Sequence, residues 1–230
     1  MSAALPVVEI FGPTLQGEGR VIGQKTMFVR LGGCDWACSW CDTPYAWRPG
    51  DMGPPERLPP AAIVERLGAL DAGCRRVTLS GGNPALHDCA ALVAKLRAGG
   101  YAVHVETQGS RAPDWLGTCD AVTVSPKPPS SGMPPDWEGL GRTLRAAADP
   151  DLKIVVFDGA DLEYAVEVRR RHPTVPLTLQ PGNRAGVDGR DDLLARLAWL
   201  ADAALRRPEL GDVRVLPQMH VLLWGNRRGI

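Results

Sequence analysis

The chain has 230 residues, of which 44% are hydrophobic and 23% charged, a composition typical of a globular protein with one substantial core. Lys and Arg together number 26, as do Asp and Glu, so the net charge is zero and tight binding to nucleic acid phosphates is disfavoured. No apolar run is long enough to span a membrane and the first residues do not form a signal peptide, so we expect a single cytoplasmic domain over residues 1–230.

The first part of the chain predicts two strands joined by a glycine-rich turn. The strands are expected at residues 7–11 and 26–31, and the letters LQGEG at residues 15–19 lie in the polar stretch between them. Because side chains alternate along a strand, Met27 and Leu31 should lie on one face of the second strand and Arg30 on the other.

Three cysteines follow the second strand directly, at Cys34, Cys38 and Cys41. Three thiolates on one short loop can hold three irons of a 4Fe–4S cluster, because cysteine thiolate is the usual ligand of such clusters. No fourth cysteine has a matching spacing, so one iron would remain open to an exogenous ligand. A structural zinc site is the alternative, but such a site takes four protein ligands and no nearby His or Cys completes it. The other cysteines are scattered singly and are expected to be buried apolar residues: Cys74, Cys89 and Cys119.

Strands and helices are expected to alternate after a proline-rich connection at residues 42–60, which no helix can cross. The further strands are predicted at residues 76–80, 101–106, 121–124, 152–157 and 175–179. The helices are predicted at residues 61–70, 87–97, 138–148, 161–171 and 191–207. The last helix should bury a stripe made of Leu193, Leu194, Leu197, Leu200, Ala201, Ala204 and Leu205. Residues 169–171, all Arg, should form a solvated face.

This alternation predicts the α/β class, with a parallel sheet and right-handed crossovers. About six parallel βα units fall short of the eight that close a TIM barrel, so we expect a partial, open TIM-type barrel with short N-terminal and C-terminal additions. Five of the six strands run into glycine-rich or polar stretches. In such folds chemistry gathers beyond the carboxyl ends of the strands, so these stretches should share one mouth with the cysteines.

The cysteine loop and the strand ends resemble the radical S-adenosylmethionine (SAM) superfamily, in which SAM binds the open iron. The pair Gly81 and Gly82 resembles the family's GGEP motif, whose backbone binds the SAM amino group, although Asn83 stands where that motif has Glu. The resemblance implies that SAM is bound by Trp40, Cys41, Asp42, Gly81, Gly82, Asn83, Glu106, Thr107, Ser125, Pro126, Lys127 and Gln180.

Four further stretches resemble the 7-carboxy-7-deazaguanine synthases within that superfamily. They are LQGEG at 15–19, Arg30 four residues before the first cysteine, CDTPYAW at 41–47 and PQMHVLLWGNRRGI at 217–230. The resemblance implies conversion of 6-carboxy-5,6,7,8-tetrahydropterin to 7-carboxy-7-deazaguanine with loss of ammonia, in queuosine or other 7-deazapurine biosynthesis. It also implies Mg²⁺, catalytic use of SAM, a flavodoxin or ferredoxin as electron donor, and a homodimer.

The same resemblance implies a set of substrate-binding residues: Leu15, Gln16, Gly17, Glu18, Arg30, Ser80, His220 and the terminal Ile230. Arg30 offers a planar fork suited to a carboxylate, and its alternative role is an inward salt bridge to Glu18. His220 is otherwise a core or surface histidine. Thr43 is implied as the Mg²⁺ ligand, and without the resemblance it would be a loop cap.

Two rival functions share the cysteines. One is an activase of glycyl-radical enzymes, which has no need of LQGEG, Arg30 or the C-terminal stretch. The other is a non-catalytic zinc or iron–sulfur scaffold.

Overall fold

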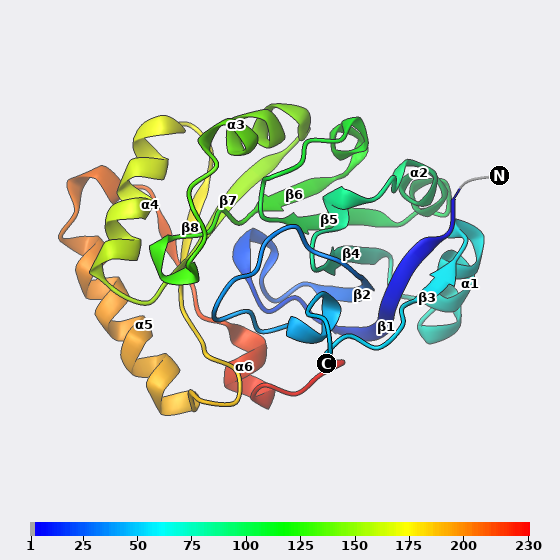
Figure 1. Ribbon diagram of the computed structural model, residues 1–230, viewed down its shortest axis with the longest axis horizontal. Helices are drawn as coiled ribbons and strands as arrows, with labels where there is room; N and C mark the ends of the chain where they lie inside the picture. Colours follow the sequence, from blue (N-terminus) through cyan, green and yellow to red (C-terminus); the bar gives the residue numbers. More distant parts are fainter. Residues whose placement is uncertain (1–2) are drawn as a thin grey trace.

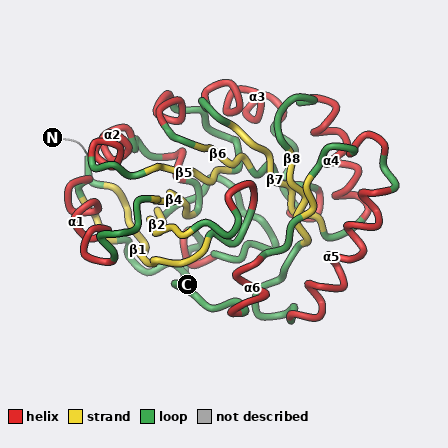
Figure 2. Tube along the Cα trace, turned by 180° about the vertical axis from the view of Figure 1, so that it is seen from behind, coloured by secondary structure: helices red, strands yellow, loops and turns green. Residues whose placement is uncertain are grey.

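The computed structural model describes residues 3–230, which form one curved sheet with helices on its outer side (Figures 1 and 2). The sheet has nine strands in the order β3-β1-β2-β4-β5-β6-β7-β8-β9. The strands are β1 Leu5–Leu15, β2 Lys25–Leu31, β3 Glu56–Leu58, β4 Arg76–Gly81, β5 Ala102–Thr107, β6 Ala121–Val124, β7 Pro150–Val156, β8 Leu177–Pro181 and β9 Arg214–Val215. The α-helices are α1 Pro60–Leu70, α2 Ala90–Ala98, α3 Trp137–Ala146, α4 Gly159–Arg171, α5 Arg190–Leu205 and α6 Met219–Trp224.

The six predicted parallel strands are confirmed as β2, β4, β5, β6, β7 and β8, each hydrogen-bonded to the next in parallel. The N-terminal addition is β1, which pairs antiparallel with β2 and with the short edge strand β3. At the other edge β9 adds a short parallel strand. The sheet does not close on itself, so the fold is the open, partial barrel that the sequence predicts.

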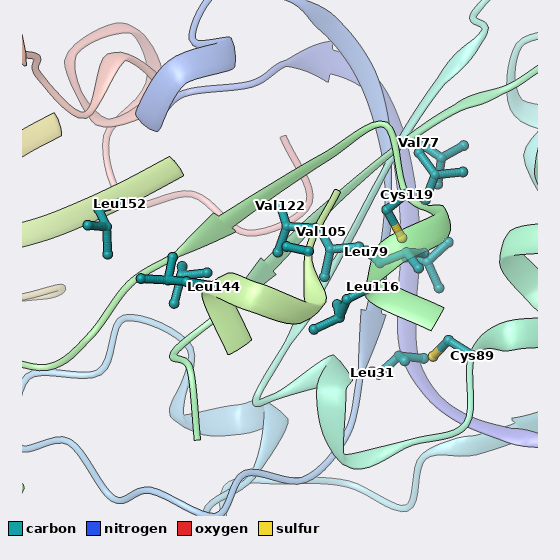
Figure 3. Close-up of a cluster of buried hydrophobic side chains, with 14 of the residues drawn as sticks. Leu31, Val77, Leu79, Cys89, Val105, Leu116, Cys119, Val122, Leu144 and Leu152 are labelled. Carbon is teal, nitrogen blue, oxygen red and sulfur yellow. The ribbon is translucent and has the colours of Figure 1, made fainter. Parts of the chain in front are cut away.

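The core lies between the sheet and the helices outside it (Figure 3). Strand residues such as Val77 and Leu79 are fully buried, as are Leu92 and Leu96 of α2. Cys89 and Cys119 lie in the same cluster, and Cys74 is also buried, so the prediction that these three cysteines are apolar core residues is confirmed. The parallel strands are therefore held from outside by apolar packing, and their carboxyl ends remain available for a site.

Besides β9, three short or extended elements differ from the sequence prediction. Strand β1 continues to Leu15 because its pairing with β2 extends through Thr14 and Leu15, so LQGEG begins on the strand rather than in a turn. Strand β3 lies inside the proline-rich connection, and α6 occupies the C-terminal stretch. Neither of the last two was predicted.

Two predictions of burial are wrong. In α5 Leu193 and Leu200 are buried, but Leu194 is 44% exposed and Leu205 is 86% exposed, because the helix contacts the sheet along a narrow line. Arg169 is buried rather than solvated. Its guanidinium donates to the carbonyls of residues 172, 173 and 175 just beyond the end of α4, where carbonyl groups lack helical partners.

In the described part of the chain, residues 3–230, no helix has both the length and the apolar character needed to cross a membrane.

Candidate active site

A cavity of about 260 Å³ opens at the carboxyl ends of the parallel strands. Its wall contains nearly every residue that the sequence singled out: Leu15, Gln16, Gly17, Glu18, Arg30, Cys34, Cys38, Trp40, Cys41, Asp42, Thr43, Ser80, Gly81, Gly82, Glu106, Thr107, Ser125, Lys127, Gln180, His220 and Ile230. Two candidates, Asn83 and Pro126, are not part of this wall. The topology therefore gathers residues from the whole length of the chain around one space.

The cysteine loop runs directly from β2, so Cys34, Cys38 and Cys41 reach the cavity together as free thiols. Burial raises the pKa of Cys34 to about 11 and also raises that of Cys38, so these two thiols are protonated in the absence of metal. Two donors face these sulfurs: the indole N–H of Trp47 lies 3.2 Å from Cys41 Sγ, and the amide of Gln108 lies 3.8 Å from Cys34 Sγ. Three soft ligands with hydrogen-bond donors to their sulfurs fit a 4Fe–4S cluster.

Asp35 fixes the cysteine loop to the neighbouring strand ends. Its carboxylate accepts hydrogen bonds from Gln108 at 2.6 Å, Ser110 at 2.8 Å and Asn83 at 3.1 Å. Asn83 is fully buried and its side-chain oxygen accepts from Thr107 at 2.9 Å. Asn83 thus holds the loop from behind instead of facing the cavity. Sequence reasoning missed Asp35 and Gln108, for which the only signal was their proximity to Cys34 and Glu106.

Gly81 and Gly82 are required by close approach to the cysteine loop. A Cβ on Gly81, whose φ is +147°, would lie 2.1 Å from the carbonyl oxygen of Leu31, and one on Gly82 would lie 2.2 Å from that of Gly33. The N–H of Gly82 donates to Leu31 and the N–H of Asn83 donates to Gly33. These N–H groups are committed to the loop and hold the glycine pair against it.

The floor of the cavity is a buried polar network centred on Lys153, which the sequence analysis did not place in the site. Its ammonium forms an ion pair with Glu18 and lies 3.7 Å from Glu106. Gln218 donates to Glu18 at 2.6 Å, and Gln16 donates to Glu106 at 3.1 Å. The alternative that Glu18 pairs with Arg30 is therefore wrong.

Glu18 and Lys153 remain charged despite their burial. Burial alone would raise the pKa of Glu18, but Lys153 and the hydrogen bond from Gln218 hold that pKa well below its usual range. Burial alone would lower the pKa of Lys153, but Glu106 and Glu18 together raise it above its usual range. The floor therefore presents a carboxylate, which accepts hydrogen bonds from a ligand's N–H groups.

Arg30 lies on the cavity face of β2, as alternation predicts, while Met27 and Leu31 are fully buried on the other face. Its Nε lies 2.6 Å from Oε1 of Glu9 on β1. Glu9 is the partner that the sequence analysis did not identify, because it lies on a neighbouring antiparallel strand.

The C-terminal helix α6 packs against the LQGEG stretch. The backbone N–H of Met219 donates to the carbonyl of Gly17 at 2.9 Å. The ring of His220 lies so close that a Cβ on Gly17 would be 2.1 Å from its Nδ1. Figure 1 shows this red segment running from the β8 side of the molecule toward β1. His220 therefore reaches the cavity from the last helix of the fold.

Comparison with known proteins agrees with this geometry. The model of the radical SAM superfamily matches residues 28–123, which contain the three cysteines and the two glycines. A 7-carboxy-7-deazaguanine synthase of Bacillus cereus is 45% identical over 98% of this chain and 99% of its own length. The chain belongs to the 7-carboxy-7-deazaguanine synthase family. A Bacillus subtilis member of that family is 42% identical over the full length of both chains.

One solved structure supports the same assignment, and a more distant one shows the same fold. The crystal structure of QueE from Escherichia coli covers 94% of this chain and 95% of its own, with 25% identity and a TM-score of 0.71. A TYW1 structure is 17% identical over 77% of this chain, with a TM-score of 0.54, and shows the fold alone.

The expected cofactors, a 4Fe–4S cluster, SAM and Mg²⁺, are those of this family. Full-length similarity to synthases also makes both rival functions wrong.

Proposed function

We propose that this synthase-family member converts 6-carboxy-5,6,7,8-tetrahydropterin to 7-carboxy-7-deazaguanine with release of ammonia, and that SAM is regenerated in each turnover. One observation supports this above the others. The same cavity holds a three-cysteine loop, a glycine pair beside it, and an arginine with an ionised glutamate for a substrate. A 4Fe–4S cluster held by Cys34, Cys38 and Cys41, together with SAM, would supply the radical chemistry, and the chain's other residues would bind, orient and shield the reactants.

The residues that would bind the cluster and SAM are the cysteine loop and the strand ends next to it. Cys34, Cys38 and Cys41 would hold the cluster. The backbone of Gly81 and Gly82, which lines the cavity, would bind the SAM amino group as the family resemblance implies. The remaining contacts to ribose, carboxylate and adenine fall to Trp40, Asp42, Glu106, Thr107, Ser125, Lys127 and Gln180.

The substrate side is assigned to Arg30, Glu18 and the C-terminal segment. The guanidinium of Arg30 is matched to the substrate carboxylate, for which a planar fork is well suited. Glu18, held ionised by Lys153, would accept from the guanidine-like N–H groups of the pterin. The other contacts are assigned to Leu15, Gln16, Gly17, Ser80, His220 and Ile230.

Thr43 is proposed as the Mg²⁺ ligand. Its hydroxyl lies 3.7 Å from Cys41 Sγ, and Thr43 is part of the cavity wall, so a cation held there would be bound at the cysteine loop. Mg²⁺ keeps several of its waters and takes few protein oxygens, which fits a site with one hydroxyl ligand.

The wider setting is proposed from the family resemblance. We place the enzyme in the cytoplasm as a single-domain homodimer that receives electrons from a flavodoxin or a ferredoxin. The free thiols at the cavity and in the core agree with a reducing compartment.

The test is a product assay under anaerobic conditions. The reconstituted protein is incubated with a reductant, SAM, Mg²⁺ and the carboxy-tetrahydropterin, and both the deazapurine absorbance and ammonia are followed. We expect equal amounts of the two products and little consumption of SAM. Arg30→Ala is the matched variant, and it should lose product formation while retaining uncoupled SAM cleavage. SAM cleavage by the wild-type protein without any deazapurine would overturn the proposal.

A further inference from the structure

Glu9 joins Arg30 to the C-terminal tail, residues 225–230. Its Oε1 accepts from Arg30 Nε at 2.6 Å and from the hydroxyl of Tyr45 at 3.0 Å. Its Oε2 accepts from Nε of Arg228, in the tail, at 2.8 Å. The Glu9 side chain is only 14% exposed and is not part of the cavity wall, whereas all three of its partners are. One carboxylate behind the wall thus holds three groups of the wall.

Aromatic stacking reinforces these contacts. The guanidinium of Arg228 lies 4.0 Å from the centre of the Tyr45 ring, and that of Arg30 lies 5.8 Å from the same ring. Burial raises the pKa of Tyr45 to about 12, so its hydroxyl stays protonated and donates to Glu9. Burial alone would raise the pKa of Glu9, but Arg228 and Arg30 lower it, so the carboxylate is ionised. The cluster is therefore fixed by charge, hydrogen bonds and ring contacts together.

The cluster of Glu9, Arg30, Tyr45 and Arg228 has more positive than negative charge. Two guanidinium groups share the single negative charge of Glu9, and the exposed Asp42 is a further acidic group whose field reaches Arg30. Glu9 engages Arg30 only through Nε, so the terminal amino groups of Arg30 are free of Glu9. A substrate carboxylate bound at those groups would supply a second negative charge to the pair of arginines.

We propose that Glu9 is a positioning residue that orients Arg30 toward the substrate carboxylate and anchors the C-terminal tail through Arg228. The inference rests on the proposed function, because the ligand of Arg30 is taken to be the 6-carboxylate of the pterin. Binding of a carboxylated substrate and docking of the tail are then coupled, since both depend on the same Glu9 side chain. Binding of a pterin that lacks the carboxylate should therefore not depend on Glu9.

The two contacts of Glu9 differ in strength because their exposure differs. The Arg30 side chain is 13% exposed, whereas that of Arg228 is 55% exposed, so water screens the second pair more. Loss of a hydrogen bond to a buried charged group weakens binding about tenfold or more. We therefore expect Glu9→Gln to raise KM for the carboxylated substrate about tenfold, and Arg228→Gln to raise it about twofold.

The experiment measures KM and kcat for wild type, Glu9→Gln, Arg228→Gln and the double variant in the reconstituted enzyme. It also measures inhibition by a tetrahydropterin lacking the 6-carboxylate. Glu56→Gln is the matched control, because Glu56 pairs with Arg66 in an exposed ion pair on the edge strand β3, outside the cavity wall. We expect KM to rise with kcat nearly unchanged, the carboxylate-free inhibitor to bind all variants alike, and the double variant to resemble Glu9→Gln.

Docking of the C-terminal tail is measured separately, in the absence of the pterin substrate. Trypsin cleavage after Arg227 is followed by mass spectrometry. Cleavage should be faster in Glu9→Gln and Arg228→Gln than in wild type and Glu56→Gln. Unchanged KM and unchanged cleavage in Glu9→Gln would overturn the inference, as would equal weakening of the carboxylate-free inhibitor. If wild type forms no deazapurine, the proposed function fails, while the cleavage rates still decide whether Glu9 anchors the tail.

Discussion

At the scale of single residues, the donors around the cysteine sulfurs set the electronic environment of the site. Hydrogen bonds to cluster sulfurs favour the reduced, more negative state and so raise the reduction potential. Trp47 supplies such a donor at 3.2 Å from Cys41 Sγ. Its position in the proline-rich connection gives this segment a role beyond linking β2 to α1.

Removal of that indole N–H should make the cluster harder to reduce. We expect Trp47→Phe to lower the midpoint potential on the order of 40 mV, which corresponds to one hydrogen bond of about 1 kcal/mol in a one-electron step. An EPR-monitored redox titration of the reconstituted protein measures this shift. Trp199→Phe, on the exposed side of α5, is the control and should leave the potential unchanged. Equal potentials in wild type and Trp47→Phe would mean that the indole does not reach the sulfur once the cluster is bound.

Residues near the cysteines could be predicted where a local pattern points to them. The spacing of Cys34, Cys38 and Cys41 and the alternation that turns Arg30 inward are both local signals. Glu9 and Asp35 could not be predicted in the same way. Their partners lie up to 219 residues away in sequence, and only the folded sheet brings them together.

At the scale of elements, the contact between the LQGEG stretch and α6 depends on the absence of a side chain at Gly17. A methyl group there would lie 2.1 Å from Nδ1 of His220, and the helix would have to move. The hydrogen bond from Met219 to the Gly17 carbonyl would be strained by that movement. Gly17 thus determines how close the C-terminal helix approaches the cavity.

Gly17→Ala should therefore displace α6. We expect KM for the pterin to rise and the free energy of unfolding to fall by about 1–3 kcal/mol, the usual cost of overpacking. Gly53→Ala is the matched control, because a methyl group on Gly53 would meet no atom within 4 Å. Kinetics and thermal denaturation of both variants provide the measurement. If Gly17→Ala has the same KM and the same thermal stability as Gly53→Ala, the position of α6 does not depend on the contact between Gly17 and His220.

Long elements were predicted from the sequence more reliably than short ones. The parallel strands are apolar runs between turn residues, which is a strong local signal. Strand β3 has three residues and β9 has two, too few to show a period. The extension of β1 through Gly12 and Pro13 results from pairing with β2, and that tertiary contact overrides the local preference for a turn.

At the scale of the whole molecule, a buried polar chain continues inside the barrel below the cavity. His104 lies 2.9 Å from the hydroxyl of Thr123, which donates to Asp151 at 2.9 Å. Burial raises the pKa of Asp151 to about 6 from 3.8, and burial lowers the pKa of His104 to about 3 from 6.5. Both groups therefore resist charging in the folded protein.

The two shifts act in opposite directions on stability. The contribution of Asp151 is fully present below pH 3.8 and is lost as the pH rises through about 6. The contribution of His104 is fully present above pH 6.5 and is lost as the pH falls toward about 3. As the pH falls into the mildly acidic range, the stability contributed by Asp151 increases and offsets part of the stability lost at His104.

Asp151→Asn should remove this offset. Between about pH 7 and about pH 5 we expect its free energy of unfolding to fall by about 1 kcal/mol more than that of wild type, since one pKa unit corresponds to about 1.4 kcal/mol. His104→Gln should show the opposite change, so that its free energy of unfolding falls less than that of wild type over the same range. Urea denaturation at the two pH values tests both variants. Parallel profiles for wild type and Asp151→Asn would show that Asp151 does not titrate in this range.

The meeting of the two ends of the chain at one cavity has a consequence for biosynthesis on the ribosome. Gln218 reaches Glu18 across 200 residues, and Arg228 reaches Glu9 across 219. A nascent polypeptide can form the sheet and expose the cysteine loop while these late residues are still unsynthesised. The cysteine loop can therefore be exposed before Gln218 and Arg228 complete their part of the cavity wall.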